Sequence, residues 1–271
     1  MQISRRDFVR YSARAAGALW VSNQLSGCSL PSSRGSLSDV TFTHGVASGD
    51  PAAESVVLWS RAVATDAADS LTVGWEVAQD PSFSQVVRSG VVNTGAERDF
   101  TAKVDVRELD PGTDYFYRFL GRGGASAVGR TKTLPRGLVE RVRFAVFSCS
   151  NYPAGYFHAY AEASQRPDID AFVHLGDYFY EYGEGGYGYD TAVALGREYA
   201  EDNRGELFSL RDYRNRYALY RSDSDLQGMH ATAPVIAVWD DHEIANDTWM
   251  QGAENHNDGE GSFDTRKAAA V

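Results

Sequence analysis

The stretch DAFVHLGDYFYEYG (residues 170–183) joins an unbroken apolar run to a polar end. Residues 171–175 form a short, mostly apolar run, which predicts a buried strand. Gly176 and Asp177 follow this strand directly, and Tyr180 comes three residues after Asp177. The aspartate and the tyrosine could belong to an ordinary turn with aromatic residues around it, or they could be two ligands of one metal ion.

Two further segments have the same character. VRFAVFSCS (142–150) and PVIAVWDDHE (234–243) are also continuous apolar runs without the alternation of a half-exposed strand. Segments with helical character lie between the runs, at residues 156–164 and 210–221. Continuous strands separated by helices are typical of an α/β domain whose strands are buried on both faces. We therefore expect such a domain over residues 140–271.

The preceding part of the sequence has a different pattern. Residues 40–134 contain segments in which apolar and polar residues alternate, as in SLTVGWEVA (70–78) and FTAKVDVREL (100–109). This period of two predicts strands with one face in a core. ELDPGTDYFYRF (108–119) resembles the corner of a fibronectin type III domain, in which Tyr115 would hydrogen-bond back across the corner. The expected fold is therefore two domains, an all-β sandwich followed by the α/β domain.

The N-terminus carries features of a targeting segment. SRRDFVR (4–10), with a mildly apolar stretch after it, resembles a twin-arginine export signal; the alternative is a basic amphipathic N-terminus. Residues 13–24 are too short and too polar to span a bilayer. LSGC, which ends at Cys28, resembles a lipobox and would make Cys28 a lipid anchor. We expect a signal over residues 1–28 that engages the twin-arginine export machinery, a tether over 29–39, and a periplasmic or outer-surface location.

The charge balance limits the classes of partner. The protein has 26 basic and 37 acidic residues and a net charge of -11. Residues 1–28 hold four Arg and one Asp, so the remainder is more acidic still. A nucleic-acid-binding surface is normally basic, and this balance argues against one. An anionic substrate is not excluded, because bound cations can reverse the local field.

Polar side chains follow each predicted strand of the α/β domain. Cys149 follows the first, Asp177 and Tyr180 follow the second, and Asp241 and His242 follow the third. Each has an ordinary interpretation by itself, because a lone cysteine is often a buried small residue and an aspartate after glycine often caps a turn. In α/β folds, however, sites assemble beyond the carboxyl ends of strands. Thiol, carboxylate, phenol and imidazole from three strand ends together predict a metal site.

The motifs around these residues resemble a known family. GDYFY (176–180) matches the Gly-Asp-x-x-Tyr motif of binuclear metallophosphoesterases, and WDDHE (239–243) is similar to their Gly-Asn-His-Asp/Glu motif. FSCSNY (147–152), GDYFYEYG and WDDHEIANDTW together resemble PhoD-type alkaline phosphatases. HGVASGDP (44–51) and VVLWSR (56–61) resemble the N-terminal domain of the same family. The resemblance covers nearly all of the sequence after the predicted signal.

The resemblance implies an exported phosphatase with a mixed centre of Fe³⁺ and Ca²⁺, which hydrolyses phosphate monoesters or diesters by attack of a metal-activated water. By the match, Cys149 and Tyr180 would bind the ferric ion. Asp177 would bridge the two ions, and Asp241 would serve the second. His242 would stabilise the transition state or protonate the leaving alkoxide. Further candidates near the site are Asp240, Asn246 and Asp247.

The resemblance also leaves an alternative open. The remaining Asp and His ligands of the family have no counterpart in this sequence, so the α/β domain is expected to be partial and the protein truncated at its C-terminal end. The alternative is a non-catalytic cell-surface β-sandwich module attached to a degenerate metallophosphatase-like partner. The sequence does not select the physiological ester.

Overall fold

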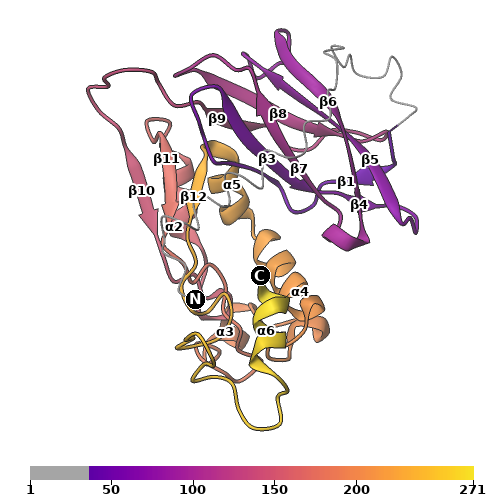
Figure 1. The fold of residues 1–271 in the computed structure, drawn as a ribbon, viewed down its shortest axis with the longest axis vertical. Coiled ribbons are helices and arrows are strands. Elements are labelled where there is room, and N and C mark those ends of the chain that lie inside the picture. Colours follow the sequence, from indigo (N-terminus) through magenta and orange to yellow (C-terminus); the bar gives the residue numbers. More distant parts are fainter. Residues whose placement is uncertain (1–36) are drawn as a thin grey trace, which may run out of the picture.

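The computed structural model describes residues 37–271, which form a β-rich part and a part that mixes helices with parallel strands (Figure 1). The predicted signal with Cys28, and most of the predicted tether, lie outside the described residues. The strands are β1 Val40–Thr41, β2 Val46–Gly49, β3 Ser55–Arg61, β4 Val63–Ala64, β5 Ser70–Ala78, β6 Val86–Gly95, β7 Thr101–Arg107, β8 Asp114–Leu120, β9 Gly129–Lys132, β10 Phe144–Phe147, β11 Ala171–His174 and β12 Val235–Ala237. The α-helices are α2 His158–Ser164, α3 Ala192–Leu195, α4 Leu210–Arg221, α5 Ser224–Thr232 and α6 Phe263–Ala270, with 3-10 turns at Ala96–Arg98, Tyr152–Ala154 and Glu201–Asn203.

Two sheets share a core in the β-rich part. One has the order β6-β5-β8-β9, and the other includes the antiparallel strands β2, β3 and β7. Val56 and Leu58 of β3 are fully buried in the same cluster as Val73 and Val77 of β5. The alternating segments therefore place one face in a core, as the period of two predicts.

The corner before β8 is closed by Tyr115, as expected. The hydroxyl of this buried tyrosine accepts a hydrogen bond of 2.8 Å from the backbone N–H of Asp110. Gly112 has a φ of 64°, a left-handed conformation that glycine adopts without steric cost. The hydrogen bond and the glycine together fix the turn that leads from β7 into β8.

A single six-stranded sheet connects the two parts of the molecule. Its order is β10-β11-β12-β2-β3-β7, and β10, β11 and β12 are parallel neighbours. β12 pairs in parallel with β2 through Val235 and Gly49. A Cβ on Gly49 would lie 3.0 Å from the carbonyl oxygen of Val235, so glycine permits this close pairing. Because β10, β11 and β12 run in the same direction, their carboxyl ends meet at one edge of the sheet.

The second predicted helix, at residues 210–221, is confirmed as α4. Ser209 begins it with a capping box, in which its hydroxyl accepts from the Asp212 N–H and the Asp212 carboxylate accepts from the Ser209 N–H. Arg216 of this helix is fully buried and donates to the carbonyl groups of Tyr180 and Tyr182. The helix thereby holds the loop that follows β11. The other helix was predicted over residues 156–164. The structure has it as α2, which begins two residues later, at His158.

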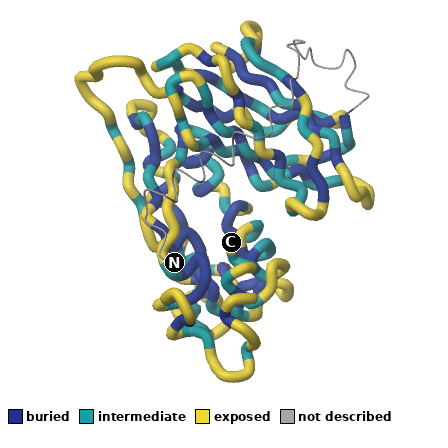
Figure 2. The backbone as a smooth tube through the Cα atoms, viewed as in Figure 1, coloured by how far each residue is buried: buried dark blue, intermediate teal, exposed yellow. Residues whose placement is uncertain are grey.

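The expectation that the α/β strands are buried on both faces is wrong for the described residues. One face packs on α2 and α5 through a cluster that includes Phe172 and Met229. On the other face Phe144, Val146 and Ile236 are exposed, and the tube of β10 carries the exposed and intermediate colours in Figure 2. No helix or strand within residues 37–271 covers these side chains, so an apolar strand composition did not imply coverage on both sides.

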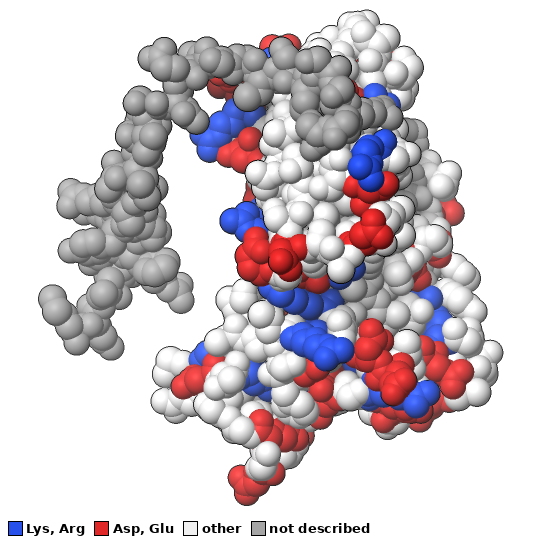
Figure 3. All heavy atoms as spheres, turned by 90° about the vertical axis from the view of Figure 1, so that its right-hand side faces the viewer, with Lys and Arg blue, Asp and Glu red and all other residues white. Residues whose placement is uncertain are grey.

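The surface carries charges of both signs. On the face shown in Figure 3, Lys and Arg side chains lie among Asp and Glu side chains. Within residues 37–271, no helix has both the length and the apolar character that crossing a bilayer requires.

Candidate metal centre

The predicted ligands follow the three parallel strands at their common edge. The backbone N–H of Cys149 donates to Gly176 O at 3.2 Å, and Val238 N–H donates to His174 O at 3.0 Å. These hydrogen bonds continue the ladder of β10, β11 and β12 beyond the strands themselves. Asp177 comes directly after this extended edge, and the loop that contains Asp241 faces it.

The backbone at this edge is strained. Gly176 has a φ of 105°, and a Cβ at this position would clash with the Asp240 backbone nitrogen, so glycine permits the close approach of the two loops. Cys149, Asp177 and Asp247 have φ values of 61°, 51° and 51°, in the left-handed region that side chains rarely adopt. Strain of this kind concentrates at functional sites, where the surrounding structure holds it.

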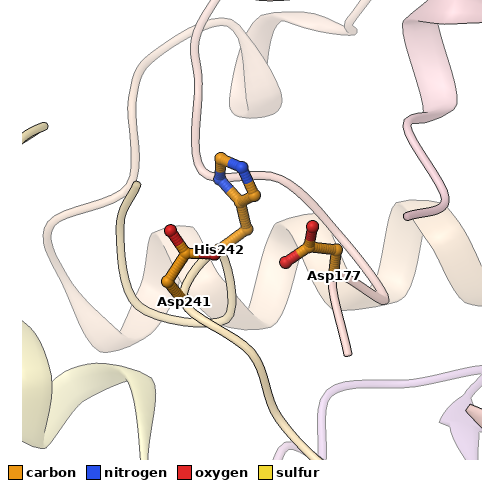
Figure 4. Close-up of side chains that lie close together, drawn as sticks. All are labelled: Asp177, Asp241 and His242. Carbon is orange, nitrogen blue, oxygen red and sulfur yellow. The ribbon is translucent and has the colours of Figure 1, made fainter. Parts of the chain in front are cut away.

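The side chains of the predicted ligands converge. One possible ligand atom from each of Asp177, Asp241 and His242 lies within 4.8 Å of the others, and Figure 4 shows the three side chains around a common space. The Oδ2 atom of Asp177 lies 3.5 Å from Cys149 Sγ and 3.2 Å from the hydroxyl of Tyr180. The structure therefore brings together the four predicted ligands and the predicted catalytic histidine.

Asp177 is the centre of this cluster. Its side chain is buried, and among the described residues its Oδ1 atom has no hydrogen-bond partner. Burial raises the pKa of Asp177, and the nearby carboxylates of Asp241 and Asp240 raise it further, although His242 and Cys149 oppose them. A buried carboxylate with an unpartnered oxygen beside other acids is costly unless a cation compensates it. The cluster thus fits a bound cation.

Tyr180 and Cys149 complete the same donor set. Burial raises the pKa of Tyr180, and its neighbours Asp177 and Cys149 raise it further. The phenol therefore keeps its proton and donates a hydrogen bond to Asp177, unless a cation stabilises the phenolate. Cys149 is exposed, so the alternative of a buried small residue does not hold for it. Both side chains contact Asp177 Oδ2, so the three would hold the same cation if one binds.

Comparison with known proteins identifies the family to which the chain is similar. The family model for the N-terminal domain of PhoD-like phosphatases matches residues 27–135, and the model for PhoD-like phosphatase matches residues 144–271. The chain belongs to the PhoD-like phosphatase family. A curated family member, alkaline phosphatase D of Bacillus subtilis (strain 168), is 37% identical over 278 residues, which cover 98% of this chain and 46% of the relative.

A solved PhoD structure supports the same assignment. It is 38% identical in sequence and superimposes with a TM-score of 0.76 over 86% of this chain and 45% of the solved protein. This PhoD-like chain thus spans about half the length of each of the two relatives. The resemblance read from the motifs is confirmed at the level of the family, and so is a two-part PhoD-like fold.

Glu181 is a residue of the PhoD-like site that the sequence did not single out. Its carboxylate is fully buried and lies 2.7 Å from His242 Nδ1. It also accepts hydrogen bonds of 2.8 Å from the Asn246 backbone N–H and from the Asn255 side chain. Burial alone would lower the pKa of His242, but the hydrogen bond and charge of Glu181 raise it above its ordinary value. Glu181 therefore favours a protonated His242 and fixes the orientation of its ring.

Glu243 is a second buried carboxylate that the sequence reasoning missed. It accepts backbone hydrogen bonds from Asp177 at 3.1 Å, Tyr178 at 2.6 Å and Asp240 at 2.9 Å. These donors come from the loops after β11 and β12, so one side chain joins the two loops that carry the ligands. The only sequence signal was the position of Glu243 at the end of the quoted WDDHE motif.

The other candidates occupy peripheral positions. Asp240 is exposed and contributes its backbone N–H to Glu243, and the Asn246 side chain donates to Glu254 at 2.9 Å. Asp247 is exposed, and its backbone N–H donates to the Asp241 carboxylate. In this geometry the backbones of these residues support the cluster, and none of the three side chains belongs to it.

Proposed function

We propose that the protein is a metal-dependent phosphatase that hydrolyses phosphate monoesters, diesters or both. The observation that carries this proposal is the convergence of Cys149, Tyr180 and the Asp241–His242 pair around the buried, partly unpartnered carboxylate of Asp177. Membership of the PhoD-like phosphatase family supports the reaction class. The name of the Bacillus relative, alkaline phosphatase D, describes that protein and agrees with the proposal.

The donor set suits two different ions. Thiolate and phenolate at Cys149 and Tyr180 would hold Fe³⁺, carboxylate oxygen at Asp241 would hold a harder ion such as Ca²⁺, and Asp177 would serve both. When bound, such ions supply a Lewis acid for the phosphoryl oxygens and lower the pKa of a water nucleophile. The unpartnered Oδ1 atom of Asp177 supports a cation at this carboxylate, and the choice of Fe³⁺ and Ca²⁺ rests on the family resemblance.

The protein's own residues supply the proton chemistry. Glu181 holds His242 through Nδ1, so the proton available for transfer would be the one on Nε2. A histidine whose pKa is raised by a buried carboxylate carries a proton at neutral pH more often than an unperturbed one. His242 can therefore donate this proton to the departing ester oxygen, and Glu181 stabilises the imidazolium before transfer.

The fold details and location belong to the same proposal. We assign the sandwich of residues 40–134 to a fibronectin III-like module and the strands β10, β11 and β12 to a metallophosphoesterase-like α/β unit. The SRRDFVR and LSGC segments support export by the twin-arginine machinery and lipid anchoring at Cys28. The substrate would then be an organic phosphate ester in the periplasm or at the outer cell surface.

The proposal is tested by phosphatase assays with chelation. The purified protein, supplied with Fe³⁺ and Ca²⁺, is expected to hydrolyse 4-nitrophenyl phosphate, bis(4-nitrophenyl) phosphate or both. A chelator should abolish the activity, and readdition of the two ions should restore it. Comparing kcat/KM for the two esters assigns the preference between monoester and diester. Hydrolysis that persists in protein shown to be free of metal would contradict the proposal, and a metal-loaded protein without activity would favour the non-catalytic alternative.

A further inference from the structure

A cavity opens beside the ligand cluster. It has a volume of about 570 Å³, which is in the range of pockets that hold small organic ligands. Cys149 and Tyr180 form part of its wall, so the cavity borders the proposed metal centre directly. The rest of its wall includes residues 155–157, which follow the 3-10 turn Tyr152–Ala154, and residues of the loop that contains Tyr187.

Two tyrosine rings in this cavity are held in place but remain accessible. The ring of Tyr156 stacks on His158 with an interplanar angle of 7°, and its hydroxyl donates to Leu195 O at 2.7 Å, yet the residue is 53% exposed. Tyr187 is 66% exposed, and its ring centroid lies 6.0 Å from that of Tyr180. Aromatic faces fixed by their own contacts can stack on a planar ligand at low entropic cost.

Tyr180 lines the cavity and also packs against His242. The His242 ring centroid is 4.2 Å from that of Tyr180 and 5.6 Å from that of Tyr182. The ring centroid of Tyr187 lies 6.0 Å from the ring centroids of both tyrosines. A group that leaves the phosphorus near His242 would therefore have the tyrosine-lined cavity next to it.

The cavity contains no compensating cation. Among the described residues that line it there is neither Lys nor Arg, and Asp190 adds a carboxylate. The guanidinium of Arg197 lies 5.3 Å from the Tyr156 ring centroid, but it is paired with Asp223 at 2.9 Å. A second negative charge on the part of the molecule held in the cavity would face the Asp190 carboxylate without a cation in the lining to compensate it. The electrostatics of the cavity thus oppose an anionic group and accept a neutral one.

We propose that this cavity binds the leaving group of the ester and selects a planar, uncharged ring over an anionic or ring-free group. The proposal rests on the proposed phosphatase function and adds the class of substrate. Tyr156 and Tyr187 supply the stacking faces, and Asp190 supplies the discrimination against negative charge. Esters of neutral aromatic or heteroaromatic alcohols are therefore preferred to esters that carry a further phosphate or carboxylate near the scissile bond.

The stacking role is tested by the Tyr187→Ala variant with two substrates. For phenyl phosphate, kcat/KM is expected to fall about ten-fold, which corresponds to about 1.4 kcal/mol and lies within the range of an aromatic stacking pair. For methyl phosphate, which has no ring, the variant and the wild type should be equal within about two-fold. The matched variant Tyr187→Phe keeps the ring and should retain wild-type values with both substrates. An equal loss on both substrates in Tyr187→Ala would overturn the proposal.

The charge selection is tested with phenyl phosphate and 4-carboxyphenyl phosphate. The carboxylated phenol is the better leaving group chemically, so a wild-type preference for phenyl phosphate would come from the protein. Asp190→Lys is expected to shift the ratio of kcat/KM values by about five-fold towards the carboxylated ester. Glu198→Lys makes the same charge change at an exposed position outside the cavity wall and should leave the ratio as in wild type.

The outcomes of these assays separate the two proposals. A wild type that hydrolyses both phenyl esters, with a ratio that Asp190→Lys does not change, overturns the charge selection and leaves the phosphatase proposal standing. A metal-loaded wild type that hydrolyses none of the esters overturns the proposed function, and the leaving-group assignment falls with it.

Discussion

Replacing Asp177 with asparagine is expected to lower kcat/KM for 4-nitrophenyl phosphate by at least about a thousand-fold, which corresponds to roughly 4 kcal/mol of transition-state stabilisation. The substitution keeps the size of the side chain but removes the charge that Cys149, Tyr180 and His242 surround. It also presents an amide N–H group to the position where we place the ions. The metal content of the purified variant should therefore fall together with its activity.

A folding defect can be separated from this loss. Asp177 is buried with an unpartnered oxygen, so removing its charge is not expected to lower the melting temperature of the metal-free protein. The control Asp66→Asn alters an exposed aspartate in the β-rich part and should behave as wild type in every assay. A variant at Asp177 that keeps both ions and more than about a tenth of the activity would contradict the role of this carboxylate.

Replacing Glu181 with glutamine is expected to lower kcat by about 10- to 100-fold, the usual cost of losing a group that orients a catalytic side chain. The neutral amide can still accept from Asn246 and Asn255, but it cannot stabilise a protonated His242. KM should change little, because Glu181 is fully buried and does not face the substrate. The measurement is kcat and KM for esters with different leaving groups.

The leaving group distinguishes proton donation from a general structural role. If His242 donates a proton, loss of Glu181 should lower kcat for phenyl phosphate more than kcat for 4-nitrophenyl phosphate. The reason is that nitrophenolate can leave without being protonated. A uniform loss across the series would instead indicate that Glu181 only supports the fold. Glu184→Gln is the matched control, since Glu184 is exposed and contacts Arg204 at 3.6 Å in a weak surface pair.

The sequence predicted the parallel strands and their polar ends because both depend on local pattern. The apolar run at residues 171–175 contains β11, and the residues after it form the loop that carries Asp177 and Tyr180. Helix α4 was predicted at its observed bounds because the periodicity of its side chains is local as well. The convergence of Cys149 with Asp177 followed from one general rule, that parallel strands end at the same edge.

Other features depend on contacts between distant segments, which local pattern does not encode. The pairing of Val235 with Gly49 joins strands from opposite ends of the sequence, and no periodicity in either strand indicates it. The exposure of Phe144 and Ile236 depends on what covers a strand and not on its composition. Glu181 and Glu243 are polar by type but buried through several hydrogen bonds each, and such burial is apparent only after folding.

The central claim is that Tyr180 and Cys149 bind a ferric ion that Asp177 shares with a second ion. It is tested most directly by the metal content and visible spectrum of the purified protein and its Tyr180→Phe variant. We predict about one Fe per protein molecule in the wild type, with a tyrosinate-to-iron absorption band in the visible range that is lost in Tyr180→Phe. Tyr182→Phe, two residues away in the same loop, should keep the band. An iron-free wild type, or a band that persists unchanged in Tyr180→Phe, would contradict the account.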